Sequence, residues 1–363
     1  MKKQTWGTMK ISWIWIVTLI FLFLPCHVKA ADQGKCGDNI AWSLSNEGVL
    51  IIEGQGSIAN SSFNNNQQVK QVKISEGITE IGNKAFWNCK NLKEITLPSG
   101  VTQIGSYAFY KCTGLKEIKL PSSVTKIGSH AFDGSGIKEM TIPQNVMEVT
   151  TLFGTSQTIE KVIFEEGRKK IPESILSGSG VREVILPESL TEIGNKAFWN
   201  CKNLKEITLP SGVTKIGSYA FYKCAGLKEI KLPFSVTKIG SHAFDGSGIK
   251  EMTIPQNVTE ATNLFGKSQM IEKVIFEEGR KKIPDSILSG SGVREVILPE
   301  SVTEIGNKVF WNCKNLKEIT LPSGVTKIGS YAFYRCTGLK KIKLPSSVTK
   351  IGSHAFDGSG IKR

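Results

Sequence analysis

The sequence has little that could support catalysis. Only four histidines occur among its 363 residues, and it contains no H-E-x-x-H, no C-x-x-C and no phosphate-binding loop. The recurring letters SGSG lack the lysine and the following helical pattern that such a loop requires. These absences argue against metal-dependent, redox and nucleotide-hydrolysing enzymes. We expect a chain that is not an enzyme and needs no cofactor or metal.

A second long apolar run is missing as well. Residues 1–30 contain three early lysines, one apolar run at 11–24, and small residues at 28 and 30. This order is typical of a secretory signal peptide cut after Ala30, and the run is short for a membrane span of about 20 residues. A retained membrane anchor is the alternative. We expect a mature chain that is secreted or held at the cell surface, without a transmembrane span.

Acidic residues are too few to balance the basic ones. The 46 Lys and Arg against 32 Asp and Glu leave a net charge of +14. Removal of the four lysines within residues 1–30 lowers this to 14 − 4 = +10 in the mature chain. A basic surface of this size attracts polyanions. Anionic glycan is therefore a candidate partner, and export argues against nucleic acid; a merely solvated basic surface is the alternative.

What the sequence does contain is repetition. The letters EIGNKAFWNCKNLKEITLPSG occupy 80–100 and return unchanged at 192–212, and a third copy at 304–324 differs only at Val309. Inside this 112-residue period lies a shorter one of 22 or 23 residues, which indicates a solenoid of stacked units. The equivalent inward position recurs in thirteen units, at Val72, Ile95, Ile118, Met140, Val162, Val184, Ile207, Ile230, Met252, Val274, Val296, Ile319 and Ile342.

A single unit can be interpreted from its own letters. The stretch LKEITLP (92–98) alternates like a strand with one buried face and ends at a proline, which cannot donate to a ladder. The stretch AFYKC (108–112) has the spacing of one face of a helical turn. Each unit is predicted to be a strand, a corner and a short helical or irregular return. Stacking then buries the apolar side that one unit leaves open.

The string LPSGVTQIGSYAFYKCTGLKEIKLPSSVTKIGSHAF (97–132) resembles the BspA-like leucine-rich repeats, and the resemblance runs from Val69 to the C-terminus. The stretch 36–56 is similar to the segment that often precedes such repeats, and its alternation predicts a β-hairpin. The resemblance implies a curved right-handed solenoid with one parallel β-sheet face, in which 31–68 form a cap and 69–363 the repeats. It also implies a surface or secreted protein that attaches to host matrix or plasma proteins, or to other microbes.

The copies match even at positions expected to be exposed, such as Lys90 and Asn91. The fold does not require that identity, so we infer recent duplication of a five-unit block. Triplication extends a surface, whereas a catalytic centre is needed only once. We therefore expect an exported, non-enzymatic binding protein, an adhesin. A cell-envelope spacer that binds anionic glycan through its charge is the alternative.

Two surfaces are candidates for binding. Outward positions on the strand face predict a contact stripe, although β-branched residues also favour sheets for their own sake; the candidates are Glu94, Thr96, Glu117, Lys119, Ile163, Ile185, Lys231, Ile275 and Ile297. On the return, an aromatic residue follows the buried position. It either contacts a partner or packs against neighbouring coils, and these residues are Trp87, Tyr110, Trp199, Tyr222, Trp311 and Tyr334.

Three smaller patterns carry expectations of their own. Each GSHAFDGSG places a histidine near an aspartate, which we interpret as a repeated polar residue beside the core, the alternative being a catalytic dyad. EEGRKK at 165–170 and 277–282 is interpreted as a solvated turn. Six cysteines share one unit position, which predicts buried thiols in preference to disulfides between adjacent coils; they are Cys89, Cys112, Cys201, Cys224, Cys313 and Cys336.

The last unit stops at Arg363, where earlier copies continue into a strand. Without a covering coil it would expose part of its apolar frame and an unpaired edge. We therefore predict that this unit is the least stable one and self-associates; truncation of a longer protein is the alternative. The residues left open are Ile342, Leu344, Val348, Ile351 and Phe356.

Overall fold

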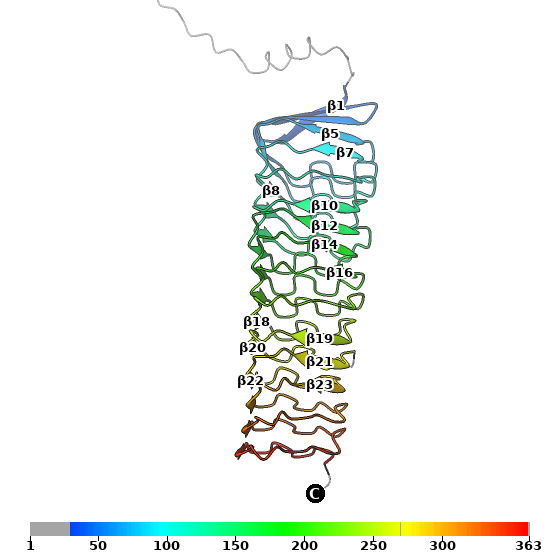
Figure 1. Ribbon diagram of the computed structural model, residues 1–363. Helices are drawn as coiled ribbons and strands as arrows, with labels where there is room; N and C mark the ends of the chain where they lie inside the picture. The colour runs from blue at the N-terminus through cyan, green and yellow to red at the C-terminus, as the bar shows by residue number, and fades with distance from the viewer. Residues whose placement is uncertain (1–29, 269, 362–363) are drawn as a thin grey trace, which may run out of the picture.

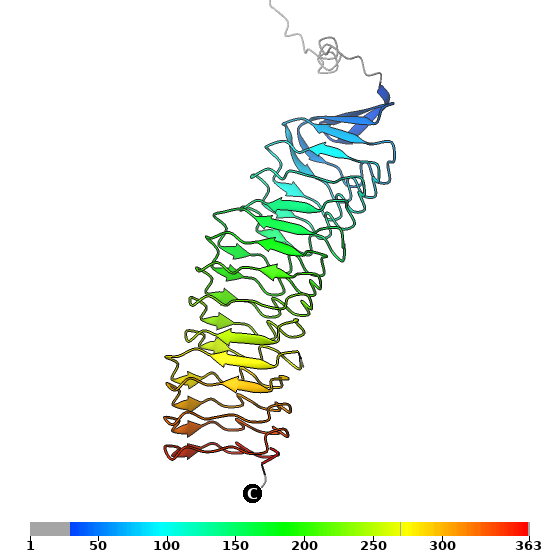
Figure 2. The same ribbon diagram turned by 45° about the vertical axis from the view of Figure 1, so that its right-hand side comes forward.

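Residues 30–268 and 270–361 are described by the structure, a computed structural model. The chain winds as a stack of coils, with β1 (Ala30–Gly37) at one end and the C-terminus at the other (Figure 1). The stack bows along its length (Figure 2). The predicted curved repeat solenoid is confirmed. Residues 1–29 of the predicted signal peptide lie outside the described residues.

The first column of parallel strands carries the alternating letters of each unit. Val72 lies in register beside Ile95 on the next coil. Within one strand Ile95 is buried while Glu94 and Thr96 point outward, the alternation of a half-buried strand. The column comprises β5 (Gln71–Ile74), β7 (Glu94–Thr96), β10 (Glu139–Ile142), β12 (Lys161–Phe164), β14 (Glu183–Ile185), β16 (Glu206–Ile207), β19 (Glu251–Ile254), β21 (Lys273–Phe276) and β23 (Glu295–Ile297).

A second column of short parallel strands was not predicted, because the sequence interpretation assigned one sheet face. Ile104 of this column lies in register between Ile81 and Ile127. The corner after each strand is tight: a Cβ on Gly105 would lie 2.5 Å from the backbone nitrogen of Asn83, so glycine is required there. The column comprises β4 (Gly56–Ile58), β6 (Ile78–Ile81), β8 (Gln103–Ile104), β9 (Lys126–Ile127), β11 (Glu148–Val149), β13 (Lys170–Ile171), β15 (Glu192–Ile193), β17 (Lys215–Ile216), β18 (Lys238–Ile239), β20 (Glu260–Ala261), β22 (Lys282–Ile283), β24 (Glu304–Ile305), β25 (Lys327–Ile328) and β26 (Lys350–Ile351).

The prediction of helical returns is wrong, and the irregular form is the correct one. No α-helix is assigned among the described residues. Lys84 and Asn88 adopt φ values of 55° and 59°, which a right-handed helix excludes. The N–H of Phe86 leaves the coil and donates to Ala108 O at 2.9 Å, whereas Trp87 N donates to O of Lys84 within its own coil. The return is thus a run of turns that also bonds coil to coil.

The core is built from identical positions stacked one above another. The rings of Phe86 and Phe109 are 5.4 Å apart and within 6° of parallel, and Phe132 continues the stack at the same distance. These side chains are completely buried. Replacing one of them by alanine is expected to cost about 3–5 kcal/mol. The core therefore runs the length of the solenoid and anchors both outer faces.

The predicted hairpin is confirmed as β2 (Ile40–Ser45) and β3 (Val49–Gly54), with Leu44 opposite Leu50. Strand β3 also pairs in parallel with β5 of the first repeat, so the hairpin covers the first edge of the column. Strand β1 adds a further antiparallel partner to β2. Pairing of this kind prevents an open edge from recruiting other chains.

Candidate functional site

The outward side of the first column carries two isoleucines on adjacent coils. Ile163 lies in register beside Ile185, and Ile275 beside Ile297. Ile185 and Ile297 are each 40% exposed, while the other two are half-buried. A partner that covers exposed apolar area of this kind removes it from water, which is favourable by about 25 cal/mol per Å² of area buried. The structure thus places the four predicted isoleucines as two equivalent pairs, 112 residues apart.

Charged side chains border these pairs. Lys161 Nζ lies 3.1 Å from Glu183 Oε1 on the next coil, and Lys138 Nζ lies 3.3 Å from Glu160 Oε1. Exposed pairs of this kind contribute little to stability and more to the choice of partner. The remaining strand-face candidates also point outward, some of them on coils where no strand is assigned; they are Glu94, Thr96, Glu117, Lys119 and Lys231.

The predicted aromatic row forms three stacked pairs on the returning side. The indole of Trp87 and the ring of Tyr110 are 6.0 Å apart and 5° from parallel. The same pair recurs as Trp199 with Tyr222 and as Trp311 with Tyr334. These side chains are half-buried, apart from Trp311 at 36% exposed. Each ring therefore both packs against the neighbouring coil and presents an edge to solvent.

The sequence interpretation missed Tyr107, and it did not place His130 beside the aromatic row. Tyr107 meets Tyr110 edge-on at 5.5 Å and stacks on the imidazole of His130 at 5.1 Å. His130 Nδ1 in turn lies 3.1 Å from Asp133 Oδ2. We call each such group an aromatic station. The three stations are Trp87, Tyr107, Tyr110, His130 and Asp133; Trp199, Tyr219, Tyr222, His242 and Asp245; and Trp311, Tyr331, Tyr334, His354 and Asp357.

The histidine–aspartate pair fits its position beside the core. Its imidazole lies flat on a tyrosine ring, and the aspartate oxygen lies over Gly154 of the next coil. The pair thus closes a gap between coils. Within the described residues, no group of three or more His, Cys, Asp and Glu side chains could hold a metal ion.

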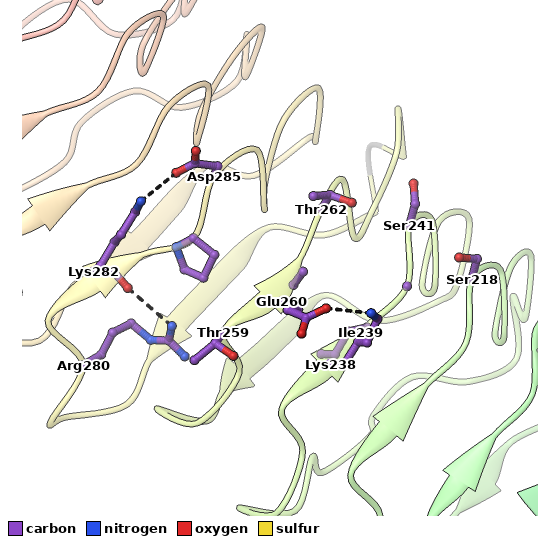
Figure 3. Close-up of a pocket in the computed structure, with 13 residues that line it drawn as sticks. Ser218, Lys238, Ile239, Ser241, Thr259, Glu260, Thr262, Arg280, Lys282 and Asp285 are labelled. Carbon is purple, nitrogen blue, oxygen red and sulfur yellow. Dashed lines mark hydrogen bonds and ion pairs between the residues drawn. The ribbon is translucent and has the colours of Figure 1, made fainter.

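The second column bears a depression of about 640 Å³ beside β18, β20 and β22 (Figure 3). On its rim Lys238 Nζ pairs with Glu260 Oε2 at 2.6 Å, and Lys282 Nζ with Asp285 Oδ1 at 3.2 Å. Its size is that of a small-molecule site, but its charges are already paired with one another. An equivalent depression of about 550 Å³ lies 112 residues earlier, with a rim that includes Lys126, Glu148, Lys170 and Glu173.

The depression lies beside a corner that is one residue shorter than the corner of the preceding coil. In most coils two consecutive residues of the corner form the hydrogen bonds to the neighbouring coils. Ser241 O accepts a hydrogen bond from Tyr219 N of the preceding coil, and His242 N donates one to Asn263 O of the following coil. In the next coil a single residue forms both bonds: Asn263 O accepts from His242 N, and Asn263 N donates to Ser286 O. Three residues (262–264) separate the second-column strand from the buried phenylalanine in this coil, whereas the preceding coil has four (240–243), and the depression lies beside this shorter corner. The lengths of the repeats contain this signal.

The interpretation of EEGRKK as a solvated turn is wrong for its arginine. Arg168 is 2% exposed and occupies the inward position that Val146 has one coil earlier. Its guanidinium donates to the carbonyls of Val146 and Pro143 and lies over the Phe164 ring. Burial lowers the pKa of Arg168 to about 10. Arg280 repeats the arrangement in the next block.

The cysteine prediction is confirmed. All seven cysteines within the described residues are free and buried. Cys89 Sγ donates to the carbonyl of Phe63 at 2.9 Å, and Cys112 Sγ to that of Phe86 at 3.0 Å. Burial raises the pKa of Cys89 to about 12, so the thiol stays neutral and unreactive at neutral pH.

Comparison with known proteins agrees with this architecture. Residues 42–153, 149–265 and 261–363 match the BspA type leucine rich repeat region in six copies, and the chain belongs to that family. A leucine-rich repeat protein from Bacteroides ovatus is 29% identical with a TM-score of 0.56, over 89% of this chain and 91% of that one. A leucine rich cell surface protein from Faecalibacterium prausnitzii is 25% identical with a TM-score of 0.41, over 89% and 91%.

Two further searches were negative. A search of curated proteins finds no match. In the part of the chain that the structure describes, no helix is long and apolar enough to cross a membrane.

Proposed function

We propose that this chain is an exported, non-enzymatic binding protein that works as an adhesin, either secreted or at the cell surface. Its ligands are proteins of the host matrix or plasma, or proteins on other microbes. The signal-like residues 1–30 support export. The observation that carries the proposal is the exposed isoleucine pair of the strand face, present in both blocks and bordered by ion pairs.

The physical argument rests on what a partner gains at this face. Covering Ile185 and its neighbour Ile163 removes apolar surface from water without reshaping the sheet. The surrounding Lys and Glu columns then select a partner of complementary charge. Because the second block repeats the arrangement, a partner that touches both pairs binds more tightly than one that touches a single pair.

The proposal is tested by binding of the whole chain to immobilised extracellular matrix and plasma proteins. The variant Ile185→Glu/Ile297→Glu changes the two exposed isoleucines. The matched control, Thr208→Glu/Thr320→Glu, adds the same charge one coil farther along the same outward column. We expect the affinity for a bound protein to fall at least about tenfold in the isoleucine variant and little in the control. Equal losses, or no binding to any such protein, would refute the proposal.

The alternative function is a cell-envelope spacer that holds anionic glycan through its general positive charge. It predicts a different salt response, because contacts between exposed charges are screened at high ionic strength. Binding through the isoleucine pairs should persist from about 50 mM to about 500 mM salt. Binding that disappears over this range, and that the isoleucine variant leaves unchanged, would favour the spacer.

A further inference from the structure

The aromatic stations gather residues that the rest of the chain lacks. All six tyrosines of the sequence lie in them, as do all three histidines beyond residue 30. Neither the Trp87 indole N–H nor the hydroxyls of Tyr107 and Tyr110 hydrogen-bond to another described residue. The rings are held by stacking, and their polar atoms remain available. Tyrosine and tryptophan with one packed side and one wet side are typical of binding surfaces.

The stations lie along one edge of the solenoid. Asn88 N donates to Tyr110 O on the next coil at 2.6 Å, and Gly178 N donates to Trp199 O at 2.7 Å. The edge is therefore continuous from one station to the next, as the regular stack of coils in Figure 2 also indicates. Five coils of about 4.8 Å separate equivalent residues, so the stations recur about every 24 Å.

The chemistry displayed at each station is that of a hydrogen-bond donor with positive charge. Lys111 Nζ lies 5.1 Å from the centre of the Tyr110 ring, Lys223 repeats this over Tyr222, and Arg335 lies over Tyr334. The aspartate of each station is already engaged by its histidine. Indole N–H, phenol O–H and ammonium groups together suit a ligand rich in acceptor oxygens.

We propose that the aromatic stations bind a linear acidic polysaccharide laid along this edge. Such a polymer repeats its carboxylate or sulfate groups at a fixed spacing, as the chain repeats its stations. Contact with several stations converts weak single contacts into strong binding. The net charge of 14 − 4 = +10 that remains without residues 1–30 draws a polyanion to the surface, and the stations give it a defined track. The proposal adds a second ligand on a second surface and does not depend on the strand-face adhesin.

The probes are heparin, which is sulfated, polygalacturonate, which is carboxylated, and dextran, which is neutral. Each is used as a short fraction of less than about 24 Å and a long fraction of more than about 48 Å, which correspond to one and three stations. We expect the long acidic fractions to bind the whole chain at least about a hundredfold more tightly than the short ones. Sulfated and carboxylated probes show which acid is preferred, and dextran should bind weakly.

Two sets of variants test the site itself. Changing all six station tyrosines to phenylalanine keeps the stacked rings and removes only the hydroxyls, so the fold is retained. The variant Lys111→Gln/Lys223→Gln/Arg335→Gln removes three station cations. Its control, Lys126→Gln/Lys238→Gln/Lys350→Gln, removes the same charge from the second column.

We expect either station variant to weaken binding of the long acidic polymers at least about tenfold, and the control to change it less than about threefold. Equal losses in control and station variants would overturn the proposal, as would dextran binding as tightly as the acidic polymers or a lack of any length dependence. Protein binding at the strand face should be unchanged in the station variants, so the two proposals fail separately.

Discussion

Asp133 and Gly154 fit each other across two coils: the carboxylate oxygen of Asp133 occupies the place that a Cβ at position 154 would take. Gly154 also has a φ of 54°, a backbone conformation that costs other residues about 1–2 kcal/mol. The sequence repeats the relationship with Asp245 and Gly266. The glycine thus makes room for the histidine–aspartate pair that completes a station.

Substituting alanine for Gly154 should therefore destabilise the protein and displace the pair. We expect a loss of about 2 kcal/mol in the free energy of unfolding, measured by urea denaturation. Gly178→Ala is the matched control, because its φ of 81° is similarly strained but its Cβ would meet no side-chain atom of the pair. In a double-mutant cycle, Asp133→Ala should reduce the cost of Gly154→Ala; strict additivity would contradict the packing argument.

The buried thiols should resist modification and make the fold sensitive to alkali. Burial raises the pKa of Cys89 and of Cys201 to about 12, so a disulfide reagent such as DTNB should not react with the native chain at pH 8. All seven cysteines from residue 31 onward should react once urea unfolds it. Rapid reaction of the native protein would show that the thiols are not held in the core.

The sign of the pH effect follows from the raised values. The contribution of a buried thiol to the free energy of unfolding is complete below the ordinary thiol pKa of 9.0 and is lost as the pH rises toward about 12. The reason is that the thiols of the unfolded chain lose their protons at a lower pH than the buried thiols of the folded chain. In this pH range each buried thiol lowers the free energy of unfolding by about 1.4 kcal/mol per pH unit. Replacing Cys89 and Cys201 by alanine should flatten the fall in the urea midpoint between about pH 9 and about pH 11.

Arg168 allows a test of how much a buried charge without a carboxylate partner contributes to the stability of the fold. Arg168→Ala should cost about 2–4 kcal/mol, because it leaves a cavity and removes the donor to the Val146 carbonyl. Arg168→Val restores the residue type found at 146 and 213 in equivalent coils, and it should cost at least about 1 kcal/mol less than alanine. Thermal unfolding of the two variants decides this; equal losses of stability in both would show that the hydrogen bonds of the guanidinium, and not the volume it fills, stabilise the coil.

The last coil of a chain that ends at Arg363 should be a site of self-association. Leu344 is 40% and Ile351 is 48% exposed, whereas Ile328 one coil earlier is fully buried. We expect concentration-dependent dimers in sedimentation, and Leu344→Lys/Ile351→Lys should abolish them. In the monomeric variant, amide exchange after Lys341 should be faster than in the middle coils. Equal protection in both regions would rule out a weak last unit.

Features that repeat with the local period were predictable without a structure. The buried position of Cys89, the outward direction of Ile185 and the hairpin around Leu44 all follow from alternation or spacing within one or two units. Such patterns depend on the geometry of a strand or a turn, which a short window of sequence determines. The sequence alone therefore determined the solenoid, its repeat length and the apolar inward residues of the first column.

Only the tertiary structure decided how neighbouring coils use one another. The helix spacing of Ala108 and Phe109 was misleading, because the backbone N–H groups of a return donate to the next coil. Arg168 is a charged residue, yet it is buried because carbonyls of the preceding coil accept hydrogen bonds from its guanidinium. Tyr107 and His130 lie 23 residues apart in the sequence, and their rings come into contact because the coils that carry them are stacked. These are long-range contacts, and they exist only once the coils are stacked in register.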